Sequence, residues 1–452
     1  MEVVLVSTYD LGRQPFGLAS PAAFLRRAGH TVHCFDLTRT KLPEEAVRTA
    51  ALVAFYLPMH TATRLALPVI GRVHAANPEA HLCVYGLYAP LNAHILREHG
   101  VQTVLGPEFE HDLADLAKAI TTTGSVRLQP ADVLRPQDPL PRVRFVVPDR
   151  SDLPALSRYA TLQVGDERRV AGYTEATRGC KHRCRHCPIV PVYDGRFRAV
   201  DADVVLADIR AQVASGARHI TFGDPDFFNG PTHAMRIVDA LAAEFPGLTY
   251  DVTIKIEHLK QQSVLLPRLR DTGCAFVTSA VESFDDEVLA RLEKGHTFAD
   301  FVGVVERCAT IGLALSPTFV AFTPWSTTTG FARMLHEIDR LGLIAAVSPI
   351  QYAIRLLIPQ GSRMLELPDV RERIDGFDAQ SLTHVWRHAD PAVDRLQQEL
   401  ELLVGRRMNA SRDEMFARVW DVAHAAAGVM PPPRQPLLAR AAVPYLNEPW
   451  YC

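Results

Sequence analysis

The sequence predicts an α/β protein in which an N-terminal doubly wound parallel sheet is followed by a complete or partial (β/α) barrel and a small helical C-terminal region. Short apolar runs alternate with amphipathic stretches from the N-terminus onward. A proline-rich segment interrupts this alternation, which then resumes from about residue 166 to 360. Strands that alternate with helices are typical of parallel sheets, so the interruption predicts two α/β domains.

The N-terminal domain is expected over residues 1–125. Residues 2–6 and 30–36 are strand-like and flank an amphipathic stretch that ends at Arg27, which predicts a βαβ unit. The same alternation continues, with strands expected at 51–56, 81–85 and 103–105 and helices near 62–76, 90–99 and 110–120.

Residues 126–165 are expected to be a linker because prolines recur there among polar and basic residues. The barrel domain is placed at 166–365, with strands expected at 219–222, 250–254, 276–278, 315–320 and 346–350. Chemistry in such barrels is found at the C-terminal ends of the strands. Residues 366–452 are expected to form a helical cap and an extended C-terminal tail.

The charge balance argues against a nucleic-acid or membrane partner. The net charge is -3, from 48 basic and 51 acidic residues, so no overall positive field attracts polyanions. The N-terminus lacks a signal-peptide core, and no apolar run approaches the length of a spanning helix. A cytoplasmic location is therefore expected. There the eight cysteines serve more readily as ligands, catalysts or buried apolar residues than as disulfides, and Cys274 and Cys308 are expected to be packing residues.

The strongest functional signal is the spacing C-x3-C-x2-C formed by Cys180, Cys184 and Cys187. Three thiolates from one short loop can hold an iron-sulfur cubane and leave one iron without a protein ligand. A zinc site completed by His182 or His186 is the alternative. A redox disulfide is weaker, because three cysteines leave one unpaired.

This motif closely resembles that of the radical S-adenosylmethionine (SAM) superfamily. The resemblance implies a [4Fe-4S] cluster whose open iron chelates SAM and which cleaves SAM reductively. The segment containing Gly223, Asp224 and Asp226 resembles the family segment that contacts the SAM amino group. An ordinary strand-to-helix turn with an acidic cap is the alternative for that segment.

Two further family resemblances imply cofactor-binding residues. Glu282 and Ser283 resemble the pair that ends a strand beside the SAM ribose and methionine; a surface capping box is the alternative. A solvated surface role is expected for Lys294. Arg355 is a candidate partner for a carboxylate of SAM or substrate, and an interdomain salt bridge is its alternative.

The N-terminal domain resembles the cobalamin-binding Rossmann-like module that precedes many radical SAM barrels. The D-x-H-x-x-G sequence that supplies an axial histidine is absent, and Gly86-Leu-Tyr replaces the usual paired-glycine turn. Base-off binding without a protein ligand exists in this class, so the sequence leaves two readings open: functional cobalamin, or a domain that serves as scaffold.

The C-terminal tail is expected to dock, since Trp450 and Tyr451 cost free energy if left in water. It resembles radical SAM proteins with a Cys-Cys-Ala-Glu-Pro or Cys-selenocysteine-Ala-Glu-Pro ending, which are related to the enzyme of arsinothricin biosynthesis. By this resemblance Cys452 is a catalytic candidate. One hypothesis is that a selenocysteine codon was read as a stop after Cys452; a simple cysteine at a docked terminus is the alternative.

These features predict an enzyme that transfers a SAM-derived group, such as 3-amino-3-carboxypropyl, to a soft small-molecule acceptor such as As(III), with a reductant such as flavodoxin or ferredoxin. The alternatives are a cobalamin-dependent radical SAM methyltransferase or another radical modification of a metabolite, and a non-enzymatic iron-sulfur or zinc redox sensor.

Overall fold

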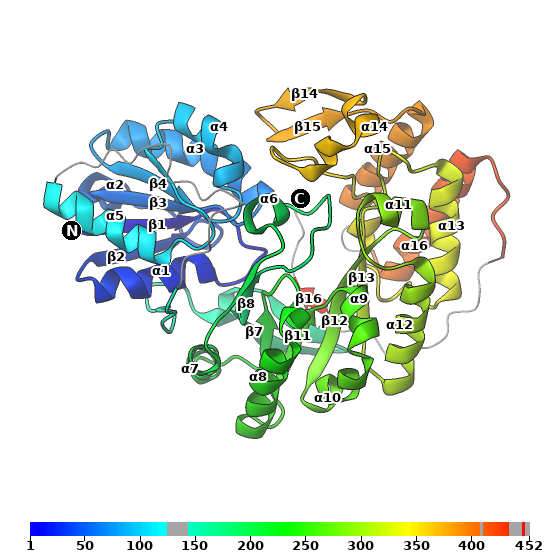
Figure 1. The fold of residues 1–452 in the computed structure, drawn as a ribbon, viewed down its shortest axis with the longest axis horizontal. Helices are drawn as coiled ribbons and strands as arrows, with labels where there is room; N and C mark the ends of the chain where they lie inside the picture. Colours follow the sequence, from blue (N-terminus) through cyan, green and yellow to red (C-terminus); the bar gives the residue numbers. More distant parts are fainter. Residues whose placement is uncertain (124–142, 407–409, 434–444, 448–452) are drawn as a thin grey trace.

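A computed structural model describes residues 1–123, 143–406, 410–433 and 445–447. The N-terminal domain is a parallel sheet with the strand order β2-β1-β3-β4-β5 (Figure 1). Its elements are β1 (Glu2–Ser7), α1 (Phe16–Arg27), β2 (Thr31–Asp36), α2 (Glu44–Thr49), β3 (Leu52–Tyr56), α3 (His60–Ala76), β4 (His81–Tyr85), α4 (Ala93–Glu98), β5 (Thr103–Val104) and α5 (Glu110–Thr123).

Strand β1 lies inside this sheet, between β2 and β3. Val3, Val4, Leu5 and Val6 are all completely buried, as expected for a strand covered on both faces. Helices α1 and α5 pack against one face of the sheet, and α3 packs against the other. The predicted doubly wound sheet is confirmed.

The second domain is a partial barrel built on a sheet with the order β13-β12-β11-β10-β7-β6-β16. The strands from β7 to β13 are parallel, whereas β6 and β16 pair antiparallel at one edge. Its strands are β6 (Thr161–Val164), β7 (Glu167–Thr174), β10 (His219–Phe222), β11 (Thr249–Thr253), β12 (Cys274–Glu282), β13 (Leu315–Phe319) and β16 (Tyr445–Asn447). Strand β6 falls inside the range predicted to be a linker.

Helices cover the outer face of this sheet and bury one continuous apolar core, which includes Cys274 and Cys308 as expected. The helices are α7 (Ala202–Ala214), α8 (Pro231–Glu244), α9 (Ile256–Gln261), α10 (Leu266–Asp271), α11 (Asp286–Arg291), α12 (Phe298–Ile311) and α13 (Thr328–Arg340). No helix among the described residues is both long enough and apolar enough to span a membrane.

The prediction of a strand at 346–350 is wrong. This segment forms turns and enters the 3-10 helix η6 (Pro349–Tyr352), with Pro349 in its first turn. Proline has no N–H to donate to a strand ladder, but it suits the first turn of a helix. Beyond β13, the described chain continues the sheet only through an isolated parallel bridge between Phe322 and Arg355.

The C-terminal region contains a hairpin as well as helices. Strands β14 (Ile374–Asp378) and β15 (Thr383–Trp386) pair antiparallel. Helices α15 (Pro391–Arg406) and α16 (Arg412–Ala427) pack with α13 on the barrel. The tail then returns as β16, where Tyr445 pairs with Gln163 and Asn447 with Thr161 of β6. Trp450, Tyr451 and Cys452 lie outside the described residues.

Candidate functional site

The cysteine loop begins where β8 (Thr177–Gly179) ends and leads into α6 (Val190–Tyr193). Burial raises the pKa of Cys180 to about 11 and that of Cys187 to about 12, and charge on the neighbouring thiols of the motif adds to both shifts. The thiols of Cys180 and Cys187 are therefore near enough to their neighbours in the motif for the charges to interact. The other cysteines among the described residues are buried in apolar cores. The loop therefore supplies three thiols, and a fourth iron of a cubane would be open to an exchangeable ligand.

Hydrogen bonds within the barrel fix the start of this loop. The Asn229 carboxamide accepts from the Lys181 N–H at 3.1 Å and donates to the Gly179 carbonyl at 3.0 Å. The Asp224 carboxylate accepts from Ala176 N at 2.9 Å and from Thr177 Oγ1 at 2.6 Å. Burial raises the pKa of Asp224 to about 7. Both oxygens of Asp224 therefore hold the strand that leads into the loop, and its predicted contact with SAM stays a prediction.

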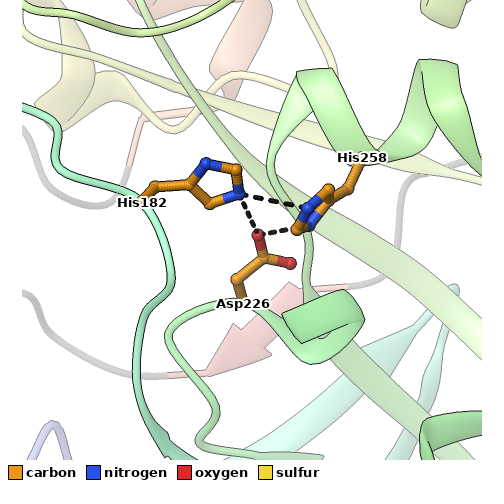
Figure 2. Close-up of side chains that lie close together, drawn as sticks. All are labelled: His182, Asp226 and His258. Carbon is orange, nitrogen blue, oxygen red and sulfur yellow. Dashed lines mark hydrogen bonds and ion pairs between the residues drawn. The ribbon is translucent and has the colours of Figure 1, made fainter. Parts of the chain in front are cut away.

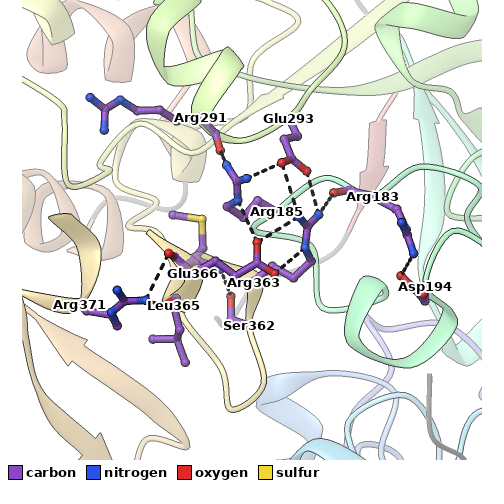
Figure 3. Close-up of polar contacts among 11 residues, drawn as sticks. Arg183, Arg185, Asp194, Arg291, Glu293, Ser362, Arg363, Leu365, Glu366 and Arg371 are labelled. Atoms are coloured by element: carbon purple, nitrogen blue, oxygen red, sulfur yellow. Dashed lines mark hydrogen bonds and ion pairs between the residues drawn. The ribbon is translucent and has the colours of Figure 1, made fainter. Parts of the chain in front are cut away.

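A network of charged side chains clamps the outer side of the loop (Figure 3). Arg185, from the loop, pairs with Glu293 beyond α11. Arg363, from the C-terminal region, lies 2.8 Å from Glu293 and 3.0 Å from Glu366, and it also donates to the Arg183 carbonyl at 2.7 Å. The loop is thus held by two segments that are distant in the sequence.

Gly223 is required by packing as well as by any ligand. A Cβ at this position would lie 1.8 Å from the Tyr173 hydroxyl of the adjacent strand β7. Tyr173 is buried, and its ring contacts Phe16 of the N-terminal domain. The Tyr173 ring therefore occupies the space on one side of Gly223.

Glu282 forms a buried charge cluster at the end of β12. Its Oε1 lies 3.0 Å from His186 Nε2 of the cysteine loop and 3.3 Å from Lys294 Nζ. Burial alone raises the pKa of Glu282, but the charges of Lys294 and His186 outweigh it and lower the pKa to about 2. Its φ of 71° is also rare for a residue with a side chain. The surface role expected for Lys294 is wrong, because this side chain is 3% exposed.

The remaining predicted residues are placed as follows. Ser283 follows Glu282, and its hydroxyl accepts from Asp285 N at 3.0 Å, while Asp285 caps α11. Arg355 lies 2.7 Å from Asp394 and stacks on Trp386, so it forms the salt bridge named as its alternative. Roles of Ser283 and Arg355 toward SAM stay predictions, as does that of Cys452, outside the described residues.

Several buried polar residues near the loop were missed at the sequence level. Lys255 and His258 follow β11, and His296 follows Lys294. Burial and the positive charges of Lys294 and Lys255 lower the pKa of His296 to about 4. The sequence could have indicated Lys255 and His258 as site residues, because polar residues that follow a barrel strand lie at the catalytic end of the barrel.

The site fits an iron-sulfur cluster with SAM. Polar atoms there are buried without a hydrogen-bond partner, including His186 Nδ1 beside the cysteines, Ser279 Oγ of β12 and both ring nitrogens of His296. Buried polar atoms are almost always satisfied, so such a concentration indicates that a polar ligand completes the site. The three thiols on one short loop supply the donors that an iron-sulfur cluster requires.

The cleft beside the N-terminal domain is smaller in this structure than cobalamin. In a 2-1-3-4-5 sheet, ligands bind beyond the carboxyl ends of the strands near β1 and β3. The Tyr56 ring occupies this place, packed so closely that a Cβ on Gly17 would lie 2.2 Å from it. The cleft between this edge and the barrel encloses about 200 Å³. Drug-sized ligands occupy about 300–1,000 Å³, and cobalamin is larger than these.

A buried ion pair closes the same interface. Arg178 of β8 lies 2.6 Å from Glu110 of α5 and 2.7 Å from Glu175, and its side chain is 7% exposed. Glu108 accepts from the Tyr193 hydroxyl at 2.7 Å. Polar groups of the two domains are thus paired with one another across the contact.

Comparison with known proteins finds a family match for part of the chain. The model of the radical SAM superfamily matches residues 174–323. The hopanoid C-3 methylase of Methylococcus capsulatus is 22% identical over 320 residues, which cover 69% of this chain and 62% of that protein. The tRNA-2-methylthio-N(6)-dimethylallyladenosine synthase of Desulfosudis oleivorans is 28% identical over 207 residues, 44% of each chain. The chain thus spans less than two thirds of the length of these curated relatives.

Among solved structures, the chain is similar to the cobalamin-dependent SAM radical enzyme OxsB with aqua-cobalamin bound. The TM-score is 0.72 at 14% identity, over 94% of this chain and 71% of that one. It is also similar to the radical SAM methyltransferase TsrM from Kitasatospora setae, with a TM-score of 0.57 at 18% identity over 75% and 70% of the two chains. At these identities the likeness establishes the two-domain fold.

Proposed function

Because this chain contains a radical SAM domain, we propose that it is an enzyme that cleaves SAM reductively and transfers a SAM-derived group to a soft small-molecule acceptor. Radical SAM domains bind a [4Fe-4S] cluster and SAM, and here Cys180, Cys184 and Cys187 would hold the cluster. The observation that carries the proposal is one short loop that contains these three thiols and lies beside buried polar atoms without hydrogen-bond partners. The bound cluster would supply the electron that breaks a carbon-sulfur bond of SAM.

The residues around the loop would position SAM rather than react with it. Glu282, kept ionised by Lys294 and His186, presents a fixed negative charge at the end of β12. Gly223 directly follows β10, and in our proposal its backbone faces the methionine part of SAM, whereas Asp226 is directed at His182 and His258. The buried walls exclude water, which protects a reactive carbon centre from side reactions.

Direct transfer is preferred to transfer through a corrin because of the crowded N-terminal domain. Tyr56 packed on Gly17 and the Arg178–Glu110 pair narrow the interface where a corrin would be expected to bind. In our proposal this domain is a scaffold that closes one side of the barrel. The acceptor would be a soft centre such as As(III), because Cys452 would offer a thiol ligand of matching softness.

A cobalamin-dependent methyl transfer is the second candidate. One observation favours it: the fold matches a structure of a cobalamin-dependent radical enzyme over 94% of this chain. Under this alternative Tyr56 would have to leave the Gly17 surface for the cofactor to enter. A reductant such as flavodoxin or ferredoxin is proposed under both candidates, since the cluster must be reduced from outside.

Product analysis separates the two candidates. The full-length protein is reconstituted anaerobically with iron and sulfide and is then given SAM, dithionite and arsenite, with or without hydroxocobalamin. Direct 3-amino-3-carboxypropyl transfer yields methylthioadenosine that depends on arsenite and not on cobalamin. Cobalamin-dependent 5'-deoxyadenosine and retention of the corrin after gel filtration would support methyl transfer instead. Absence of both nucleosides from protein with a filled cluster would overturn the proposal of SAM cleavage.

A further inference from the structure

Three side chains from separate parts of the barrel meet next to the cysteine loop (Figure 2). His182 comes from the loop itself, Asp226 follows β10, and His258 lies on α9. His182 Nε2 is 3.1 Å from His258 Nε2 and 3.5 Å from Asp226 Oδ2, and His258 Nδ1 is 2.7 Å from Asp226 Oδ2. One ligand atom from each residue can be chosen so that all lie within 4.8 Å of one another.

Other groups hold these side chains in place from behind. Asp226 Oδ1 accepts from the Phe228 N–H at 3.1 Å, which leaves Oδ2 directed at the two imidazoles. His182 Nδ1 lies 3.5 Å from the Glu257 carboxylate, and this carboxylate lies 3.0 Å from Lys255 Nζ. A carboxylate behind a ring nitrogen is the usual arrangement around a metal-binding histidine, because it fixes the orientation of the ring.

Hydrogen bonds alone do not satisfy this group. Asp226 Oδ2 and His258 Nδ1 are buried and have no well-directed hydrogen bond, although they are 2.7 Å apart. The two Nε2 atoms face each other, so at most one can carry the proton between them. The side chains of Asp226 and His258 are each 2% exposed, which keeps water from completing the group from outside.

We propose that His182, Asp226 and His258 bind a divalent transition-metal ion such as Zn²⁺. Two imidazoles and one carboxylate are a common ligand set for this class of ion, and three protein ligands leave an open coordination position. The site is separate from the thiols of the cluster, although Asp226 is close enough to Cys180 to interact with its charge. A ligand with an oxygen or nitrogen donor would take the open position.

Metal analysis of the cluster-loaded protein tests this proposal, with Zn²⁺ as the probe. The full-length protein is reconstituted with iron and sulfide so that the three cysteines are occupied, incubated with Zn²⁺ and desalted. We expect about one zinc per chain in addition to the cluster iron. Zinc-edge X-ray absorption should show only nitrogen and oxygen ligands, at about 2.0–2.1 Å, with the multiple scattering of imidazole. This readout does not depend on SAM turnover.

Matched variants assign the zinc to these residues. His258→Gln and Asp226→Asn should each weaken zinc binding at least about tenfold. His219→Gln is the control, because His219 is also buried and also lies 2.8 Å from a carboxylate, that of Asp251, outside the proposed site. Iron content and circular dichroism show whether each variant is folded. If a variant does not fold, the zinc-edge spectrum of the unaltered protein still tests the proposal.

Three results would overturn the proposal. They are a filled cluster with no retained zinc, zinc with sulfur ligands at about 2.3 Å, and full zinc binding by both site variants. Any of these results would show that the three residues form a hydrogen-bonded network and not a zinc site. None of them bears on SAM cleavage, which the product analysis tests separately.

Discussion

The Lys294 ammonium lies 3.3 Å from the Glu282 carboxylate, and both side chains are buried beside the cysteine loop. His186 completes the cluster from the loop itself at 3.0 Å from the same oxygen. A charge at this depth is stable only because it is paired. The geometry of the loop and the charge at the end of β12 therefore depend on each other.

Replacing Lys294 should destabilise the barrel strongly. Lys294→Met leaves the Glu282 carboxylate with the His186 imidazole alone, and breaking a buried pair costs about 3–5 kcal/mol. Denaturant unfolding of the metal-free protein measures the loss. Lys260→Met is the matched control, because the exposed Lys260–Asp300 pair contributes at most about 1 kcal/mol. Equal losses in the two variants would contradict the buried cluster.

Adding one methyl group at Gly223 should disturb the site. Gly223→Ala places a Cβ 1.8 Å from the Tyr173 hydroxyl, so the strands must shift at a cost of about 1–3 kcal/mol. Weaker SAM retention, measured by equilibrium dialysis, should accompany the lower stability. Gly303→Ala is the control: its Cβ meets no atom within 4 Å on α12, and the change should stabilise by about 0.5–1 kcal/mol. Unchanged stability and SAM retention in Gly223→Ala would show that the Tyr173 side chain moves aside freely.

Arg178 should couple the two domains. Arg178→Met leaves the buried carboxylates of Glu110 and Glu175 without their partner, at a cost of about 3–5 kcal/mol. Loosening of the contact should speed limited proteolysis between the domains. Arg210→Met, which removes the exposed pair with Glu244, should leave the cleavage pattern unchanged. Identical proteolysis of both variants would argue that the interface is held by other contacts.

Removal of a motif cysteine should abolish cluster assembly. Cys184→Ala leaves two thiols in the loop, and iron content together with the charge-transfer absorbance of the reconstituted protein should fall to background. Cys308→Ala is the control, since Cys308 is a buried packing residue of α12. Retention of the full iron content by Cys184→Ala would refute the assignment of the motif.

The sequence by itself determined the fold class and the cluster motif. Apolar runs such as residues 2–6 have a period and length that only a buried strand satisfies, and the spacing of Cys180, Cys184 and Cys187 is a local property of one loop. Local patterns of this kind can be interpreted without knowing what packs against them. The same reasoning was wrong at 346–350, where apolar residues suggested a strand but Pro349 begins a 3-10 helix.

Only the tertiary structure decided which side chains meet. The sequence predicts a surface role for Lys294, yet folding places its ammonium group against Glu282. His182, Asp226 and His258 are far apart in the chain and converge because parallel strands deliver their carboxyl ends to one side of the sheet. Such contacts arise from the packing of separate elements, so a local sequence pattern does not predict them.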